Sequence, residues 1–303
     1  MEVYTMYTQI SNYLNVIKNE KKLSIHTQKA YKTDLYQFAK FSHGQIIDKK
    51  LISQYIAFLN SQYAARTVKR KLASLHAFFT EVTCGAPEQS PFYNQRIRIN
   101  TPKQLPRIIP SEVINGLLHS AYDNYDPNKR TTLLEIMVFE LLFGAGLRVS
   151  ELCSLTSESF TILSHGLRLH INGKGNKDRI IELTTADIIR VAKLYITAYQ
   201  EEIQNLGFIL INRQGKKLSP QSVRRIICNH LKKINSPYHV TPHMFRHTFA
   251  TSLLDEGADI RFIQALLGHS SISTTQIYTY VSTKQQSRIL AQKHPRNKMS
   301  FTI

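Results

Sequence analysis

Two arginines and a histidine between positions 148 and 246 have the types and spacing of a phosphate-binding site. Arg148 opens a predicted helix just after the glycine-rich reversal 144–146. A guanidinium beside the unpaired N–H groups of a helix start suits an oxyanion or a phosphate. His243 and Arg246 are three residues apart, so they share one face of a second predicted helix. Taken alone, Arg148 with Glu151 also fits an ordinary surface salt bridge.

A lysine, Lys174, is predicted at the tip of a β-hairpin. Apolar and polar residues alternate over 167–171, and the apolar pattern resumes over 180–183 after a turn that contains Gly173 and Gly175. A flexible ammonium on a glycine-rich tip suits a proton donor to a phosphate or a leaving oxygen. The motif is neither a P-loop nor a dinucleotide fingerprint. A plain polar hairpin tip is the alternative.

A histidine and a tyrosine complete the group of reactive side chains. His269 follows a predicted helix, 260–267, that Asp259 caps and Gly268 ends. Tyr278 lies in the second turn of a helix that a capping box over 273–276 begins. A tyrosine hydroxyl has a pKa of about 10, so it becomes a nucleophile only beside cations or a base. Either residue by itself also fits an ordinary surface position.

Metal and disulfide sites are not predicted. His243 and His247 are four residues apart, but no glutamate stands between them as in H-E-x-x-H, and no cysteine ligand is near. The three cysteines, Cys84, Cys153 and Cys228, are far apart and form no C-x-x-C pair. This cysteine usage fits a reducing cytoplasm.

The charge of the chain predicts a polyanionic partner. The 303 residues carry 39 Lys and Arg against 21 Asp and Glu, a net charge of +18. Residues 1–107 alone hold +10 of this excess. No secretory signal opens the sequence, and the most apolar stretch, 133–147, is too short to cross a bilayer. We therefore predict a cytoplasmic protein that binds nucleic acid.

The first part of the chain is predicted to be a basic helical module. Helical periodicity covers 10–17, 25–41, 51–59 and 65–79, with Ser24 as the cap of the second of these. The start of the last helix carries four basic residues that we expect to face the polyanion: Arg66, Lys69, Arg70 and Lys71. A solvated basic helix end is the alternative.

The chain is predicted to form two domains and a linker. A proline-rich basic connector follows the helical module, and we place the domains at 1–100 and 111–303 with the linker at 101–110. In the second domain, Ser111 is the expected cap of a helix over 112–122, and 129–143 is a strongly apolar core helix. The expected fold is mainly α-helical with a small antiparallel β-hairpin or sheet.

Several motifs together resemble the tyrosine recombinase (phage integrase) family, most closely its Xer-type members. They are G-A-G-L-R-V-S-E-L, N-G-K-G-N-K-D-R, P-H-M-F-R-H-T-F-A-T, L-L-G-H-S-S-I-S-T-T-Q-I-Y and the terminal H-P-R. The first domain is similar to the helical, SAM-like core-binding module of that family. The resemblance covers essentially the whole chain and implies a two-domain clamp on DNA.

The resemblance also implies a role for each reactive side chain. Arg148 and Arg246 would clamp the scissile phosphate, and Tyr278 would attack it to leave a 3′-phosphotyrosyl bond. Lys174 would protonate the leaving 5′-oxygen, while His243 would act in acid–base transfer and His269 would hydrogen-bond the phosphate. The family pattern selects Tyr278 over Tyr280. Neither ATP nor a metal would be required.

The implied partners are a double-stranded DNA site and further protomers, as a homotetramer on two sites or an assembly with a paralogous recombinase. The implied process is chromosome dimer resolution, or integration, excision or inversion of a mobile element. Two alternatives remain: a type IB topoisomerase-like nicking-closing enzyme, and a non-catalytic DNA-binding protein with the same fold.

Overall fold

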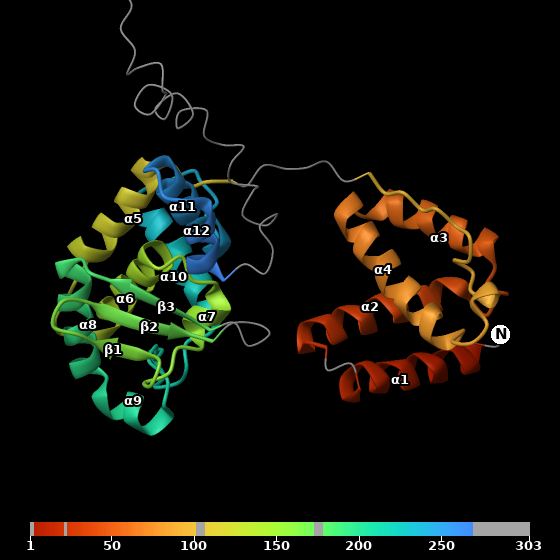
Figure 1. Cartoon of the computed structure of the whole chain (residues 1–303), viewed down its shortest axis with the longest axis horizontal. Helices are drawn as coiled ribbons and strands as arrows, with labels where there is room; N and C mark the ends of the chain where they lie inside the picture. Colours follow the sequence, from red (N-terminus) through yellow and green to blue (C-terminus); the bar gives the residue numbers. More distant parts are fainter. Residues whose placement is uncertain (1–2, 21–22, 101–106, 173–177, 269–303) are drawn as a thin grey trace, which may run out of the picture. The chain divides into compact units, whose positions relative to one another are not determined.

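The computed structural model describes residues 3–20, 23–100, 107–172 and 178–268. The chain divides into two compact units, Met1–Gln104 and Leu105–Ile303, and each unit is described by itself (Figure 1). The described residues are mostly helical, with one small antiparallel sheet. The fold class predicted from periodicity is therefore confirmed. None of the described helices is both long and apolar enough to cross a membrane.

The first unit packs its helices around an aromatic core. The helices are α1 (Val3–Asn19), α2 (Ile25–Ser42), α3 (Lys49–Gln62), α4 (Ala65–Val82) and the short η1 (Pro87–Gln89). Phe38, Tyr55 and Phe78 are among its largest fully buried side chains, and the ring of Phe38 meets that of Tyr55 edge-on at 4.9 Å. The predicted cap of α2 is confirmed, because Ser24 Oγ accepts the N–H of Thr27 at 3.2 Å.

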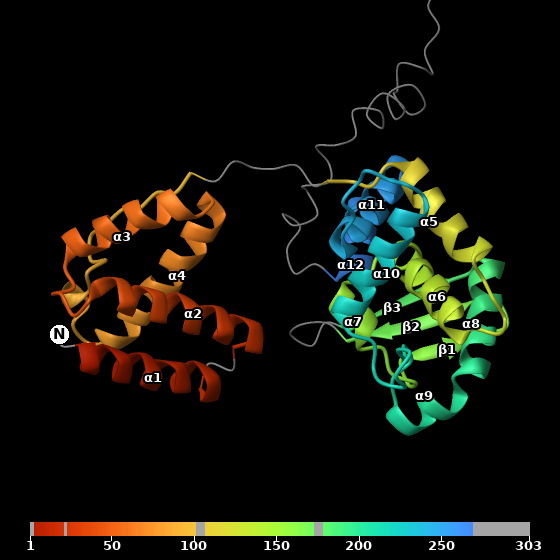
Figure 2. The ribbon, with the colours of Figure 1, turned by 180° about the vertical axis from the view of Figure 1, so that it is seen from behind.

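The second unit packs a small sheet and further helices against one central helix. Before and within the sheet the elements are α5 (Ser111–Asp123), α6 (Arg130–Gly144), α7 (Val149–Cys153), β1 (Phe160–Ile162), β2 (Leu167–Ile171) and β3 (Arg179–Leu183). After it come α8 (Ala186–Ala198), α9 (Gln200–Leu206), α10 (Pro220–Lys233), α11 (Pro242–Asp255) and α12 (Ile260–Leu267). Helix α6 is apolar on all sides, as expected of a core helix. Both views place it between α10 and α8 (Figures 1 and 2).

The predicted cap of α5 was wrong. Pro110 occupies the cap position, and Ser111 is the first residue of the helix, where its hydroxyl bonds Glu112 at 3.3 Å. The helix still begins where the apolar pattern begins, because Val113 and Ile114 donate their N–H groups to the Pro110 carbonyl. Backbone pairing therefore fixes this helix start without a side-chain cap.

The sheet is a three-stranded meander in the order β1-β2-β3. Strand β2 pairs antiparallel with both neighbours, and Leu169 lies opposite Phe160 on one side and Ile181 on the other. Alternate residues of β3 face inward, so Arg179 and Ile181 are buried while Ile180 is exposed. A charged residue thus stands at an inward position, which requires a partner inside the unit.

A buried histidine joins three helices of the second unit. His230 on α10 meets Ser120 Oγ on α5 at 2.8 Å with Nδ1, and Glu135 Oε2 on α6 at 2.9 Å with Nε2. The serine, histidine and carboxylate have the residue types of a hydrolase triad. However, His230 is fully buried, so no substrate reaches it and we interpret the cluster as structural.

Candidate active site

One glutamate holds together the predicted phosphate-binding arginines. Glu151 lies in α7, directly after the reversal that Gly146 makes with a positive φ of 58°. Its Oε2 accepts the backbone N–H of Arg148 at 2.8 Å, and its Oε1 accepts Arg148 Nη1 at 2.7 Å. The carboxylate therefore fixes both the backbone and the guanidinium of Arg148 at the start of α7.

Arg246 reaches the same carboxylate from α11. Its guanidinium is almost fully buried and lies 3.7 Å from Glu151 Oε2. Nη1 donates to the carbonyl of Gly146 at 3.0 Å, and Nη2 donates to the carbonyl of Leu267 at the end of α12. The structure thus brings Arg148 and Arg246 together, although they are far apart in the sequence.

Arg179 is a third arginine at this carboxylate, and we did not predict it. It opens β3 and donates Nη1 to Glu151 Oε1 at 3.1 Å and Nη2 to Oε2 at 2.8 Å. Its Nε donates to the carbonyl of Leu266 at 2.7 Å. The signal that could have identified it is strand alternation, which places Arg179 on the inward face together with Ile181.

Three guanidiniums around one carboxylate leave this region strongly positive. Burial raises the pKa of Glu151, but hydrogen bonds from Arg179 and from the backbone and side chain of Arg148 outweigh it and hold the pKa below its usual value. Glu151 is therefore ionised at neutral pH and cancels one of the three positive charges. The remaining positive charge suits an anion such as a phosphodiester.

Two histidines of α11 border the arginines. His243 and His247 lie one turn apart, on either side of Arg246 along the helix. The pKa of His243 is lowered below its ordinary value, mainly because burial removes water from the imidazole. The positive charges of Arg246, Arg148 and Arg224 lower it further. His243 is nevertheless exposed, so its neutral imidazole is open to a substrate. The part of the chain that the structure describes contains no His, Cys, Asp and Glu cluster able to hold a metal ion.

The glycine before Arg148 is required by both its conformation and its surroundings. We expect Gly146→Ala to lower the free energy of unfolding by about 2 kcal/mol, because a non-glycine residue at positive φ costs about 1–2 kcal/mol and the new Cβ would lie 2.4 Å from the ring of Phe249. Chemical denaturation followed by circular dichroism measures the change. Gly215→Ala is the matched control, because Gly215 also has a positive φ but nothing lies within 4 Å of its Cβ position. Equal losses in both variants would show that the ring contact is unimportant.

Three of the six predicted catalytic residues lie outside the described residues: Lys174, His269 and Tyr278. The described structure ends on either side of the first at Asn172 and Asp178, and before the other two at Gly268. Their roles stay predictions. Of the remaining three, Arg148 and Arg246 share Glu151, and His243 is close enough to both for their charges to lower its pKa.

The four basic residues predicted to contact DNA differ in their surroundings. Arg66, Lys69 and Arg70 are exposed on α4, whereas only 4% of Lys71 is exposed. The Lys71 ammonium donates to Asp34 Oδ1 at 2.9 Å and to Gln37 Oε1 at 2.6 Å, and it lies 4.9 Å from the centre of the Tyr63 ring.

Asp34 therefore organises the basic end of α4 from inside the first unit. Its side chain is fully buried and also accepts hydrogen bonds from Arg70 and from Ser74 Oγ. Because Lys71 is committed to this buried network, it is a poor phosphate contact. A lysine in a basic run can equally serve as the counter-ion of a buried carboxylate, and the run itself does not distinguish the two.

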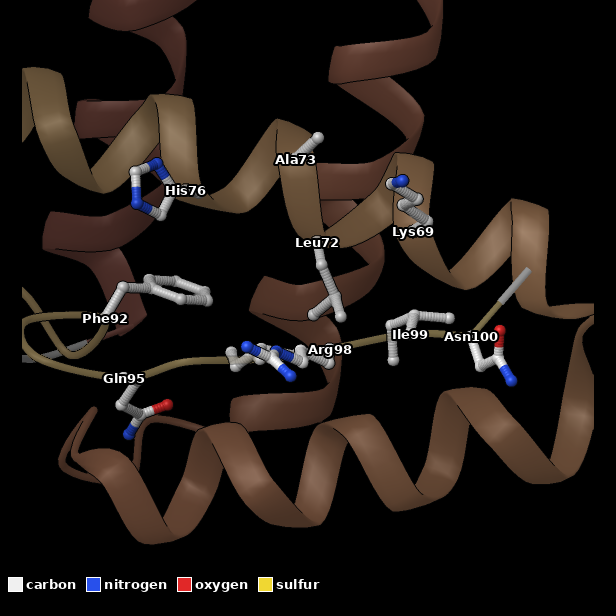
Figure 3. A pocket seen from close by; sticks show the side chains of 10 residues that line it. Lys69, Leu72, Ala73, His76, Phe92, Gln95, Arg98, Ile99 and Asn100 are labelled. Atoms are coloured by element: carbon white, nitrogen blue, oxygen red, sulfur yellow. The ribbon is translucent and has the colours of Figure 1, made fainter.

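A cavity of about 630 Å³ lies beside α4 on the first unit. Lys69, Leu72 and His76 line it from α4, and Arg98 and Ile99 line it from the segment that follows Phe92 (Figure 3). Its lining combines apolar side chains with the basic Lys69 and Arg98. Lys69 is thus both exposed and part of a recessed basic surface.

Comparisons with family models cover most of the chain. The model described as "Phage integrase family" matches residues 107–285, and that described as "Phage integrase, N-terminal SAM-like domain" matches residues 10–83. A "Tyrosine recombinase" of Agathobacter rectalis is 38% identical over 309 residues, which cover 98% of this chain and 99% of the relative. "Tyrosine recombinase XerD" of Staphylococcus epidermidis is 34% identical over 312 residues, or 96% of this chain and all of the relative.

Solved structures share the fold at lower identity. XerH bound to a palindromic difH substrate, in a post-cleavage complex, superposes with a TM-score of 0.76 at 21% identity and covers 93% of this chain and 84% of that one. A λ integrase tetramer bound to a Holliday junction gives 0.68 at 16% identity, over 90% and 76%. These structures match the fold, and the two family models confirm the SAM-like helical first part and the catalytic second part expected from the sequence.

Proposed function

Because this chain belongs to the phage integrase family of tyrosine recombinases, which are DNA strand-transferring enzymes, we propose that it is a site-specific DNA recombinase that works through a 3′-phosphotyrosyl intermediate. The observation that supports this most directly is the positive cluster in which Arg148 and Arg246 share the Glu151 carboxylate. A cluster of this kind can bind a phosphodiester and stabilise the extra charge that the phosphorus centre acquires during attack.

The proposed cleavage step is an in-line displacement at phosphorus. The Tyr278 oxygen bonds to phosphorus while the bond from phosphorus to the 5′-oxygen breaks. The tyrosine proton passes to neutral His243, and Lys174 supplies the proton that leaves with the 5′-hydroxyl. His269 donates a hydrogen bond to the phosphate. Attack by the 5′-hydroxyl of a partner strand reverses the step and rejoins the DNA, so that the energy of the phosphodiester is conserved.

The wider organisation follows from the same proposal. Residues 1–100 form the core-binding domain, with Arg66, Lys69 and Arg70 as its exposed basic contacts, 101–110 is the linker and 111–303 is the catalytic domain. The enzyme acts in the cytoplasm on two double-stranded sites, as a homotetramer or together with a paralogous recombinase. The process served is chromosome dimer resolution, or the integration, excision or inversion of a mobile element.

Trapping the covalent intermediate tests the function. Genomic fragments that stay attached to the protein in SDS are sequenced to find the site, and a nicked suicide duplex is built on that sequence. We expect an SDS-resistant adduct in which mass spectrometry places the DNA on Tyr278. No adduct, or attachment at Tyr280, would contradict the assignment. Adducts without strand exchange between paired sites would instead indicate the nicking-closing enzyme.

The rate of adduct formation is expected to fall on the acid side of neutrality. The pKa of His243 is held below its ordinary value of about 6.5, so its base form predominates at pH 7 and is lost as the pH falls through the lowered pKa. The rate should then fall about tenfold per pH unit. His243→Gln should remove this acid limb and leave a low, pH-independent rate. An unchanged acid limb in the variant would assign the titration to another group, for which His247→Gln is the matched control.

A further inference from the structure

The guanidinium of Arg179 binds two other elements of the second unit. It donates to both oxygens of Glu151 and to the backbone carbonyl of Leu266. Only 8% of the residue is exposed. In one side chain it thus connects the first residue of β3, the carboxylate of α7 and the end of α12.

We propose that Arg179 is a positioning residue for strand transfer, which occupies Glu151 so that this carboxylate orients Arg148 without neutralising it. This inference rests on the proposed function, because it assigns Arg179 to the phosphate clamp of that reaction. Arg179 itself is buried among protein groups and is not assigned a contact with DNA.

Arg148 and Arg179 share the acceptor positions of the Glu151 carboxylate. A carboxylate has about four lone-pair positions. Those of Glu151 accept two donors from Arg148, one backbone and one side-chain, and two from Arg179. If Arg179 were removed, the carboxylate could pair with both guanidinium nitrogens of Arg148 in a fork-to-fork arrangement, which is a strong geometry. Arg148 would then be neutralised and drawn away from the phosphate.

Arg179 also binds the C-terminal end of α12. The last carbonyls of a helix lack partners within the helix and carry partial negative charge. Here Arg179 binds the carbonyl of Leu266, and Arg246 binds that of Leu267. Gly268 has a positive φ of 61° and packs on Arg179, since a Cβ there would lie 3.2 Å from Nη1. Arg179 and the proposed catalytic Arg246 therefore hold adjacent carbonyls at one helix end.

The test measures cleavage of the suicide duplex by Arg179→Met, with DNA affinity measured alongside by electrophoretic mobility shift. We expect cleavage about 10–100-fold slower than that of wild type, the range known for groups that orient the ligands of a metal, and affinity within about twofold. Arg168→Met is the matched control, because Arg168 lies on the same sheet and binds Glu182 at 2.7 Å on the exposed face. It should cleave at the wild-type rate.

A substrate with a neutral methylphosphonate at the scissile position separates positioning from general stability. A neutral phosphorus centre has less need of cations, so the deficit of Arg179→Met should shrink by at least threefold on this substrate. Removing the negative charge of Glu151 gives a second readout. The double variant Arg179→Met with Glu151→Gln should cleave no more slowly than Arg179→Met alone. An equal deficit on both substrates, or a double variant slower than Arg179→Met, would overturn the proposal.

The remaining outcomes are also decisive. If wild type forms no adduct, the proposed function fails, and the inference that rests on it fails with it. If wild type forms an adduct and Arg179→Met cleaves within twofold of it, only the inference fails. Should Arg179→Met not fold, Arg179→Lys retains the buried charge but cannot make the forked contact. In that case the same substrate comparison is made with the lysine variant and judged by the same criteria.

Discussion

Arg246→Lys is expected to slow DNA cleavage on the order of 100–1,000-fold, the cost of losing a preorganised donor to a developing negative charge. The lysine keeps the charge but not the planar fork of the guanidinium. Arg246 uses that fork to bind the carbonyls of Gly146 and Leu267, while its Nη1 lies 3.7 Å from Glu151 Oε2. A single ammonium cannot bridge both carbonyls and also reach a phosphate. The measurement is the rate of adduct formation under single-turnover conditions.

Two measurements show whether the clamp or the fold has been lost. Circular dichroism and a mobility shift should show a folded variant that binds DNA within a few-fold of wild type, because most affinity comes from other phosphate contacts. Arg190→Lys is the matched control, since Arg190 pairs with Asp187 on the exposed face of α8 and should leave cleavage unchanged. Cleavage by Arg246→Lys within threefold of wild type would remove Arg246 from the clamp.

Asp34→Ala is expected to destabilise the first unit by about 3–5 kcal/mol, the usual cost of removing one partner of a buried ion pair. The variant leaves the Lys71 ammonium buried without its carboxylate and removes the acceptor of Arg70 and Ser74. Buried charge without compensation is among the most costly changes that a single substitution can make. We expect the loss to be confined to the unit that contains α2 and α4.

Hydrogen exchange of the full-length chain, resolved by peptide mass spectrometry, measures this loss separately for each unit. Peptides of α2 and α4 should exchange faster, while those of α6 should keep wild-type protection. Asp48→Ala is the matched control, because Asp48 caps α3 by accepting the N–H of Leu51 at 2.8 Å, and losing a cap costs about 1 kcal/mol. Asp34→Asn with Lys71→Met should recover part of the stability. A loss no larger than that of Asp48→Ala would show that the buried network is not stabilising.

Elements defined by local signals were predicted well. Periodicity gave α2 to within a residue of its observed end, and the caps of α2 and α12 at Ser24 and Asp259 are both confirmed by hydrogen bonds. The hairpin of β2 and β3 also follows the predicted alternation. These signals lie within a few residues of the structure that they specify, which is why one sequence suffices to read them.

Features that depend on distant residues were not predictable. We made no prediction between Leu183 and Thr241, where the structure has α8, α9 and α10, although α10 has local start signals in its cap Ser219 and in Pro220. We placed Glu151 beside Arg148 from their three-residue spacing, but the spacing could not show that Arg179 and Arg246 bind the same carboxylate. Likewise, Lys71 is buried only because Asp34, 37 residues away, is buried opposite it. Such pairs are set by tertiary packing.

The two charged networks also bear on how this protein can be re-engineered. The Asp34 network lies wholly within Met1–Gln104, and the Glu151 network lies wholly within Leu105–Ile303. A chimera joined between these units can therefore exchange the first unit for that of a relative and still inherit both networks complete. A junction between α7 and α11, by contrast, would separate Glu151 from Arg246 and pair a carboxylate from one parent with an arginine from the other. Segment exchange should thus be tolerated at the boundary of the units and should fail inside the second one.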